Sequence, residues 1–230
     1  MKSMSLRSSR KGQAGFTLVE IAIVLVIIGL LLGGVLKGQE LIENAKIKNL
    51  ANDIRGVTAA YYTYIDRYRV TPGDDAAATT RFTGVQNGGG NGLITGEYST
   101  LVTALTATTE SNNFWQHLRA AGLVSGTGFN PASHAYGGLL GVQSDVSAAG
   151  GSTYGMVGPV LCAGSLPWKV AQALDTLIDD GNSATGSARA GAANAAANFA
   201  TANTTSNAYG PAVNASAAIE AGRHTFCVKL

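Results

Sequence analysis

Two hydrophobic patterns follow each other along the first third of the chain. Residues 16–36 are almost all apolar or small, and Glu20 is the one charge among them. From Ile47 onward, the apolar residues instead recur at alternating steps of three and four, and they are Ile47, Leu50, Ile54, Val57, Tyr61, Tyr64 and Tyr68. The first pattern predicts a helix that is apolar on all sides, and the second predicts a helix with one apolar stripe.

The two patterns are expected to lie on one continuous helix. The first strong breaker is Thr71-Pro72-Gly73-Asp74, because proline disfavours helix in the residue before it and Gly-Asp favours a turn. We therefore predict one helix from Phe16 to about Arg69. Its amphipathic part, residues 37–70, holds only about three heptads, so we expect it to pack on the protein's own head rather than in a coiled coil.

Residues 16–36 form a candidate membrane-spanning segment, since a helix of this length covers roughly 30 Å. The preceding residues carry four basic side chains and no acidic one: Lys2, Arg7, Arg10 and Lys11. This flank should stay cytoplasmic, so the rest of the chain is exported. A general secretory signal peptide fits less well, because no Ala-x-Ala cleavage site follows the apolar run.

Glu20 is the candidate functional residue of this segment. An isolated carboxylate in lipid costs several kcal/mol and needs a partner, which makes it a functional-site candidate. A partner exists if the chain is cut after Gly15, because the new α-amino group of Phe16 is a cation about one helical turn from Glu20.

The run Gly15-Phe16-Thr17-Leu18-Val19-Glu20, with basic residues before it and an apolar helix after it, resembles the prepilin signature of type IV pilins and their pseudopilin relatives. The resemblance implies that prepilin peptidase removes residues 1–15 by cutting after Gly15, and that Phe16 becomes an N-methylated terminus. It also implies that Glu20 pairs with the terminal amine of a neighbouring subunit during assembly. In this reading, residues 16–36 become the core helix of a filament.

Four glycines interrupt the helix, at Gly29, Gly33, Gly34 and Gly38. They favour close packing of membrane helices through small residues. The alternative is a segment that extends when subunits enter a filament. Many pilins carry a proline near this point, whereas this chain has Lys37 there, so the glycines would have to serve instead.

The head, residues 71–230, is predicted to make the whole chain α+β, with an antiparallel sheet and short extra helices beside the long helix. The predicted elements are a helix at 113–121 that Ser111 or Asn112 caps and Gly122 ends, strands at 138–142, 155–162 (bent at Pro159) and 224–230, and a helix at 166–178 that Pro167 starts. Residues 183–218 are almost all Ala, Asn, Thr, Ser and Gly, so we expect an exposed loop there.

The two cysteines, Cys162 and Cys227, are expected to form one disulfide, because an even pair in an exported protein most simply does so. Two buried free thiols are the alternative. The disulfide would close the low-complexity tract at its base. In type IV pilins a disulfide-closed region near the C-terminus is exposed on the fibre, and this similarity favours a pilin over a pseudopilin.

Charge and motifs argue against several other classes of function. The net charge is +2, but removing the leader leaves 12 basic against 14 acidic residues, a net charge of −2. We therefore expect no nucleic-acid partner. We also expect no catalytic constellation, no cofactor and no metal.

Three sets of residues in the head are weighed as ligand sites and set aside. The loop 87–94 has the cadence of a calcium loop but offers amides and glycines instead of carboxylates. Trp115 and His117 are expected to be a core tryptophan and an exposed or capped histidine. Asp175 with the pair 179–180 is expected to belong to a polar turn that ends a helix.

The sequence therefore predicts a structural subunit of a type IV pilus, with copies of itself, prepilin peptidase and an inner-membrane assembly platform as partners. The precursor would cross the inner membrane once and then enter an extracellular filament that serves adhesion, motility or DNA uptake. A pseudopilin of a type II secretion system is the alternative within the same architecture. A membrane-tethered binding protein or minor pilin adhesin is the alternative of another class.

Overall fold

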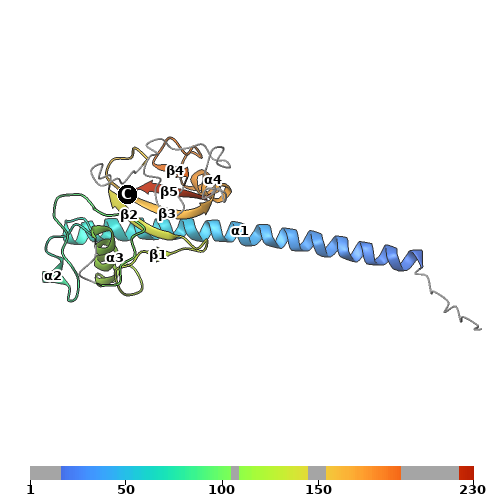
Figure 1. The fold of residues 1–230 in the computed structure, drawn as a ribbon, viewed down its shortest axis with the longest axis horizontal. Coiled ribbons are helices and arrows are strands. Elements are labelled where there is room, and N and C mark those ends of the chain that lie inside the picture. The colour runs from blue at the N-terminus through green and yellow to red at the C-terminus, as the bar shows by residue number, and fades with distance from the viewer. Residues whose placement is uncertain (1–16, 105–108, 145–153, 193–222) are drawn as a thin grey trace, which may run out of the picture. The chain divides into compact units, whose positions relative to one another are not determined.

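The computed structural model describes residues 17–104, 109–144, 154–192 and 223–230. The chain divides into two units, residues 1–44 and 45–230, which are described separately. Helix α1, Leu18–Tyr68, has residues in both units and matches the predicted long helix closely (Figure 1). It ends where Arg69 takes a positive φ of 61°, directly before the predicted breaker at Pro72.

The second unit contains a five-stranded antiparallel sheet with the order β1-β2-β3-β5-β4. Its strands are β1 (Ala132–Ser133), β2 (Leu139–Ser144), β3 (Pro159–Pro167), β4 (Ala188–Ala192) and β5 (Arg223–Lys229). The other helices among the described residues are α2 (Ala78–Arg81), α3 (Glu110–Ala120) and α4 (Trp168–Ile178). The predicted α+β architecture is confirmed.

The inner face of the sheet packs against the apolar stripe of α1. Leu50, Ile54, Val57, Tyr61 and Tyr64 are all buried, and Ile47 and Tyr68 pack partly buried at the margins. Alternate strand residues meet this stripe, and they are Leu140, Val142, Leu161, Ala163, Phe226 and Val228. The sheet thus gives residues 45–68 of α1 the core that their periodicity predicted.

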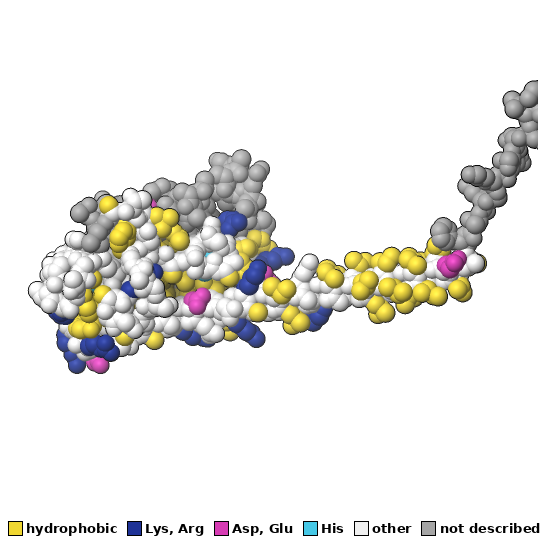
Figure 2. Space-filling model, turned by 90° about the horizontal axis from the view of Figure 1, so that it is seen from below, with side chains coloured by type: hydrophobic (Ala, Val, Ile, Leu, Met, Phe, Trp, Pro, Cys, Tyr) yellow, Lys and Arg dark blue, Asp and Glu magenta, His cyan; other side chains and the backbone are white. Residues whose placement is uncertain are grey.

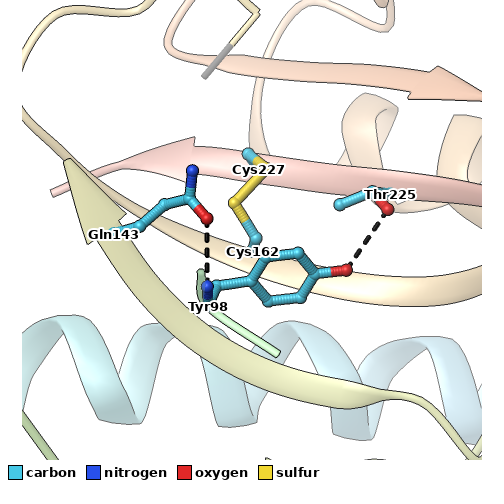
Figure 3. The surroundings of a disulfide bond; sticks show 5 residues. All are labelled: Tyr98, Gln143, Cys162, Thr225 and Cys227. Atoms are coloured by element: carbon cyan, nitrogen blue, oxygen red, sulfur yellow. Dashed lines mark hydrogen bonds between the residues drawn. A yellow bond between two sulfur atoms is a disulfide. The ribbon is translucent and has the colours of Figure 1, made fainter. Parts of the chain in front are cut away.

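The outer face of the sheet carries the predicted disulfide. Cys162 of β3 and Cys227 of β5 are directly opposite each other in the register, with Cα atoms 4.0 Å apart, and both are fully buried. The Tyr98 ring lies close to the disulfide and its hydroxyl is 3.3 Å from Thr225 Oγ1 (Figure 3). Gly141 is needed under this segment, because a Cβ there would collide with the Tyr98 carbonyl oxygen.

Two predicted boundaries are wrong at the helices. Helix α3 begins at Glu110 rather than at 113, because Thr109 and Asn112 form a capping box. Gly122 then ends α3 with a φ of 70°, as predicted. Helix α4 begins at Trp168, since Leu166 and Pro167 are still part of β3.

The strands also differ from the prediction, and β1 was not predicted. Strand β2 runs two residues further than 142, and β3 begins at Pro159 instead of bending there. Proline suits the first position of a strand because it has no N–H to donate. Strand β4 lies inside the tract predicted to be an exposed loop, where Ala188 and Ala190 are fully buried under the sheet's inner face. Residues 193–218 of that tract lie outside the described residues.

Candidate functional site

The N-terminal end of α1 is closed by a reciprocal pair of side chains. The Thr17 N–H and hydroxyl both donate to Glu20 Oε2 at 2.8 Å, and the Glu20 N–H donates to Thr17 Oγ1 at 3.3 Å. This is a capping box, in which a hydroxyl residue and a glutamate three positions later satisfy donors that the helix start leaves open. The functional candidate Glu20 thus also fixes where the helix begins.

The Glu20 carboxylate keeps capacity for a further donor. A carboxylate offers about four lone-pair sites on its two oxygens, whereas the hydrogen bonds from Thr17 reach one oxygen. Gly15 and Phe16, the predicted cleavage and methylation residues, lie outside the described residues. Their pairing with Glu20 therefore stays a prediction.

The large hydrophobic side chains of the apolar half of α1 are exposed, and Figure 2 shows them along one face of the helix. Large side chains from Leu18 to Leu36 are between 46% and 92% exposed. The helix holds a window long and apolar enough to cross a membrane, and none of that window is buried. The Lys37 ammonium and the Glu40 carboxylate, 2.8 Å apart, form the first ion pair after the apolar run.

The glycines of this half have no close neighbour within the described structure. A Cβ built at Gly29, Gly33, Gly34 or Gly38 would meet nothing within 4 Å beyond the local helix backbone. Packing within the described chain therefore does not require a glycine at any of these four positions. A packing role for them needs another helix.

His117 was expected to be exposed or capped, and it is not exposed. The imidazole is fully buried, its Nδ1 accepts the Gly73 N–H at 3.0 Å, and its Nε2 lies 2.7 Å from the Gln86 carbonyl oxygen. Burial lowers the pKa of His117, although the hydrogen bond to Gln86 acts in the opposite direction. His117 therefore joins two loops as a neutral ring. Trp115 is a core residue, as expected.

The loop of residues 87–94 is held by carboxylates that already have donors. Asp74 accepts the Asn91 N–H at 3.0 Å and the Gly92 N–H at 2.7 Å. Glu110 accepts the Gly89 N–H at 2.6 Å and also binds Thr95. Because these oxygens face N–H groups, they secure a turn here instead of offering a ligand set for a cation.

A buried charged group that the sequence did not suggest ties the end of α1 to the next loop. The Tyr64 hydroxyl donates to Asp75 Oδ2 at 2.8 Å, Arg81 pairs with the same oxygen, and the Ala77 N–H donates to Oδ1 at 2.9 Å. Burial raises the pKa of Asp75, but these donors outweigh it and the net pKa is lowered. The only hint in the sequence is that Asp75 is the second aspartate after Pro72-Gly73, in a stretch where such residues commonly close turns.

The acidic residues at the end of α4 form a turn, as expected. Oxygens of Asp175, Asp179 and Asp180 all lie within 4.8 Å of one another. Asp179 accepts the Ala188 N–H at 2.9 Å, and Asp180 accepts the Asn182 N–H at 2.8 Å. These hydrogen bonds join the helix end to the chain that leads into β4.

Comparison with known protein families identifies the N-terminal segment. Residues 10–36 match the family model of the prokaryotic N-terminal methylation motif. Neither a search of curated proteins nor a search of solved structures finds a significant match to the chain. The motif supports a type IV pilin or prepilin-type family, and it fits both pilins and pseudopilins.

Proposed function

We propose that this prepilin-type chain is a structural subunit of a type IV pilus. It is cut after Gly15, methylated on the amine of Phe16 and polymerised through α1 into a surface filament. The observation that carries the proposal is the methylation motif at residues 10–36, with Glu20 as the one charge on an exposed apolar helix. The buried disulfide of the head fits an exported location.

Glu20 in this proposal sets the position of each subunit against its neighbour. Among apolar side chains, a carboxylate and an amine gain most when they are aligned, because misplacing either leaves a desolvated charge. The capping box fixes the Glu20 carboxylate at the helix start. The α-amino group of an incoming subunit can then bind the Glu20 carboxylate while the Glu20 side chain keeps its rotamer.

The test separates the charge of Glu20 from its capping role. Glu20→Gln keeps an acceptor for the Thr17 N–H, since glutamine also completes a capping box, but it removes the negative charge. We expect both Glu20→Gln and Glu20→Ala subunits to be processed and methylated normally and to be absent from shear-released filaments. Mass spectrometry of the membrane and filament fractions measures both steps.

Glu40→Gln is the matched control, because it removes an exposed acid from the same helix outside the apolar run. It should enter filaments normally. Filaments built from Glu20→Gln subunits at the unmutated level would refute the assembly role of the charge.

Electron microscopy of the sheared material addresses the pilin assignment itself. Long fibres composed mainly of this chain are expected for a major pilin. A chain that stays in the cell envelope, or that appears only in short filaments needed for protein secretion, would instead identify a pseudopilin.

A further inference from the structure

Four basic side chains lie at one end of the second unit, the end at which the chain enters it at residue 45. They are Lys46 and Lys48 on α1, Lys169 on α4 and Arg223 on β5. Lys48, Lys169 and Arg223 are exposed, and Lys46 is half-buried. We call this surface, together with the half-buried rings of Tyr136 and Trp168, the basic end.

Contacts between α1 and the sheet place Lys46 at this end. The Lys46 ammonium lies 5.9 Å from the centre of the Tyr136 ring, in the turn between β1 and β2. In the same turn, Nε2 of His134 lies 2.9 Å from the carbonyl oxygen of Gly164 on β3. Lys46 therefore lies beside the end of the sheet at which β3 finishes.

The other two basic residues lie at the same end of the sheet. Arg223, the first residue of β5, is opposite Pro167, the last residue of β3, and its Nη1 donates to the Ser165 carbonyl oxygen at 2.8 Å. Helix α4 begins directly after Pro167, and the Lys169 ammonium lies 5.5 Å from the centre of the Trp168 ring. Since no side chain caps α4, the positive end of its helix dipole adds to the charge here.

The basic end keeps a net positive charge. No carboxylate among the described residues lies within ion-pair distance of any of its four basic side chains. The acidic residues on either side of it along α1 are Glu43 and Asp53, so basic residues outnumber them by four to two. Asp53 is seven residues beyond Lys46, or about 10 Å further along the helix. The excess charge favours an anionic partner.

The chain that enters the basic end comes directly from the apolar run. Lys46 is ten residues after Leu36, which corresponds to about 15 Å along a helix. The headgroup layer of a bilayer is about 5–7 Å thick on each side, and its surface charge acts over a further distance of about 8 Å. Lysine and arginine beside tyrosine and tryptophan rings are typical of surfaces that meet lipid headgroups.

We propose that the basic end binds an anionic membrane surface while residues 16–36 anchor the chain in the bilayer. The ammonium and guanidinium groups contact lipid phosphates, and the rings of Tyr136 and Trp168 lie at the level of the headgroups. This contact holds the head against the bilayer before the subunit leaves it. Filament assembly is not needed for the contact.

Quenching of tryptophan fluorescence by labelled lipids measures the contact. Trp168 belongs to the basic end, whereas the side chain of Trp115, the second tryptophan, is fully buried in the core. We would insert the full-length chain into vesicles of phosphatidylcholine, or of an equimolar mixture with phosphatidylglycerol, that carry a trace of lipid with a nitroxide on its headgroup. Both leaflets hold the label, so either orientation of the chain is measured.

We expect at least about twofold stronger quenching in the vesicles that contain phosphatidylglycerol, because anionic lipids attract basic segments near the surface. This excess quenching should disappear in about 1 M sodium chloride, where charges are screened within about 3 Å.

Two double variants of the basic end test which charges are responsible. Lys46→Gln/Lys48→Gln and Lys169→Gln/Arg223→Gln each remove two of the four charges, and each should lower the excess quenching by about half or more. The first variant keeps the test decisive if replacing Lys169 alters the emission of Trp168, since it changes residues on α1 only.

Arg67→Gln/Arg69→Gln is the matched control, because it removes two exposed positive charges from the opposite end of α1. It should leave the excess quenching unchanged. Equal quenching in the two kinds of vesicle, an excess that persists in high salt, or an equal loss in the control would each overturn the proposal. Quenching that rises with the number of chains per vesicle at constant lipid composition would also overturn it, since the basic end would then meet a second copy of the chain.

Discussion

The two halves of α1 share one backbone conformation and differ in what covers their side chains. In residues 18–36 the large apolar side chains are 46–92% exposed, whereas in residues 45–68 the stripe from Leu50 to Tyr64 is at most 7% exposed. The half with a stripe is covered by the sheet of its own chain. The half that is apolar on all sides has too wide a hydrophobic surface for any one face of a sheet to cover.

The two halves therefore differ in which molecules can remove their apolar surface from water. At roughly 25 cal/mol per Å² of apolar surface, the stripe stabilises the head because the head removes it from water. The outer half of α1, residues 18–36, can bury its apolar surface only in a lipid bilayer or against the helices of other subunits. The head should therefore respond strongly to changes in its core and weakly to changes in the outer half.

The largest effect is expected from the disulfide, which lies wholly in the head. The cross-link joins residues 65 apart, and the chain-entropy relation gives about 4 kcal/mol for such a loop. Cys162→Ala/Cys227→Ala should lower the free energy of unfolding of the head by about that amount. Guanidinium unfolding followed by tryptophan fluorescence measures it, because both tryptophans belong to the head.

The unmutated chain refolded under reducing conditions is the control for lost side-chain volume, since it lacks the cross-link but keeps both sulfur atoms. The disulfide would have no stabilising role if the double variant and the reduced chain both unfolded at the guanidinium concentration that unfolds the oxidised chain.

The next effect compares the same substitution in the two halves. Leu50→Ala removes a side chain that is 1% exposed, and a cavity of this kind should cost about 3 kcal/mol in the free energy of unfolding. Leu25→Ala, at a position that is 64% exposed, should change it by less than about 0.5 kcal/mol. Equal losses from the two substitutions, measured in the same unfolding assay, would mean that the outer half also supports the head.

The smallest effect is the response of the head to pH. Burial lowers the pKa of His117 and of His134, so both stay neutral where the unfolded chain, with an ordinary histidine pKa of 6.5, takes up protons. Their contribution to stability is complete above about pH 6.5 and is lost as the pH falls through the lowered values. Asp75, whose pKa is lowered from 3.8, adds a further loss below about pH 4.

Unfolding midpoints measured between pH 8 and pH 5 should therefore fall with decreasing pH. His117→Gln offers the same kinds of donor and acceptor without titrating, so it should flatten this slope. An unchanged slope in His117→Gln would show that the ring does not stay neutral in the folded head.

Much of the fold follows from local patterns in the sequence. A run of apolar residues, a stripe at steps of three and four, and a Thr-Pro-Gly-Asp breaker predict α1 to within two residues at its start and one at its end. The alternation from His224 to Lys229 places Phe226 on one face of the sheet and Cys227 on the other. The methylation motif likewise gives the position of Glu20 without any tertiary information.

The errors arise where a distant segment decides the conformation. Residues 188–192 have the composition of a loop, yet they form a strand because β5 offers a free edge and the inner face has room for alanine side chains. His117 is buried because two loops fold back onto α3. The loop between α1 and α2 contains Gly73, and the loop after α2 contains Gln86.

The sequence by itself determined the helix, its division into two surfaces, the disulfide and the N-terminal motif, because each depends on residues a few positions apart or on a single pair of cysteines. Only the tertiary structure decided the Tyr64–Asp75–Arg81 group and the neutral His117. Each of these depends on the burial of a polar group, and burial is set by segments that meet in space after long intervals of chain.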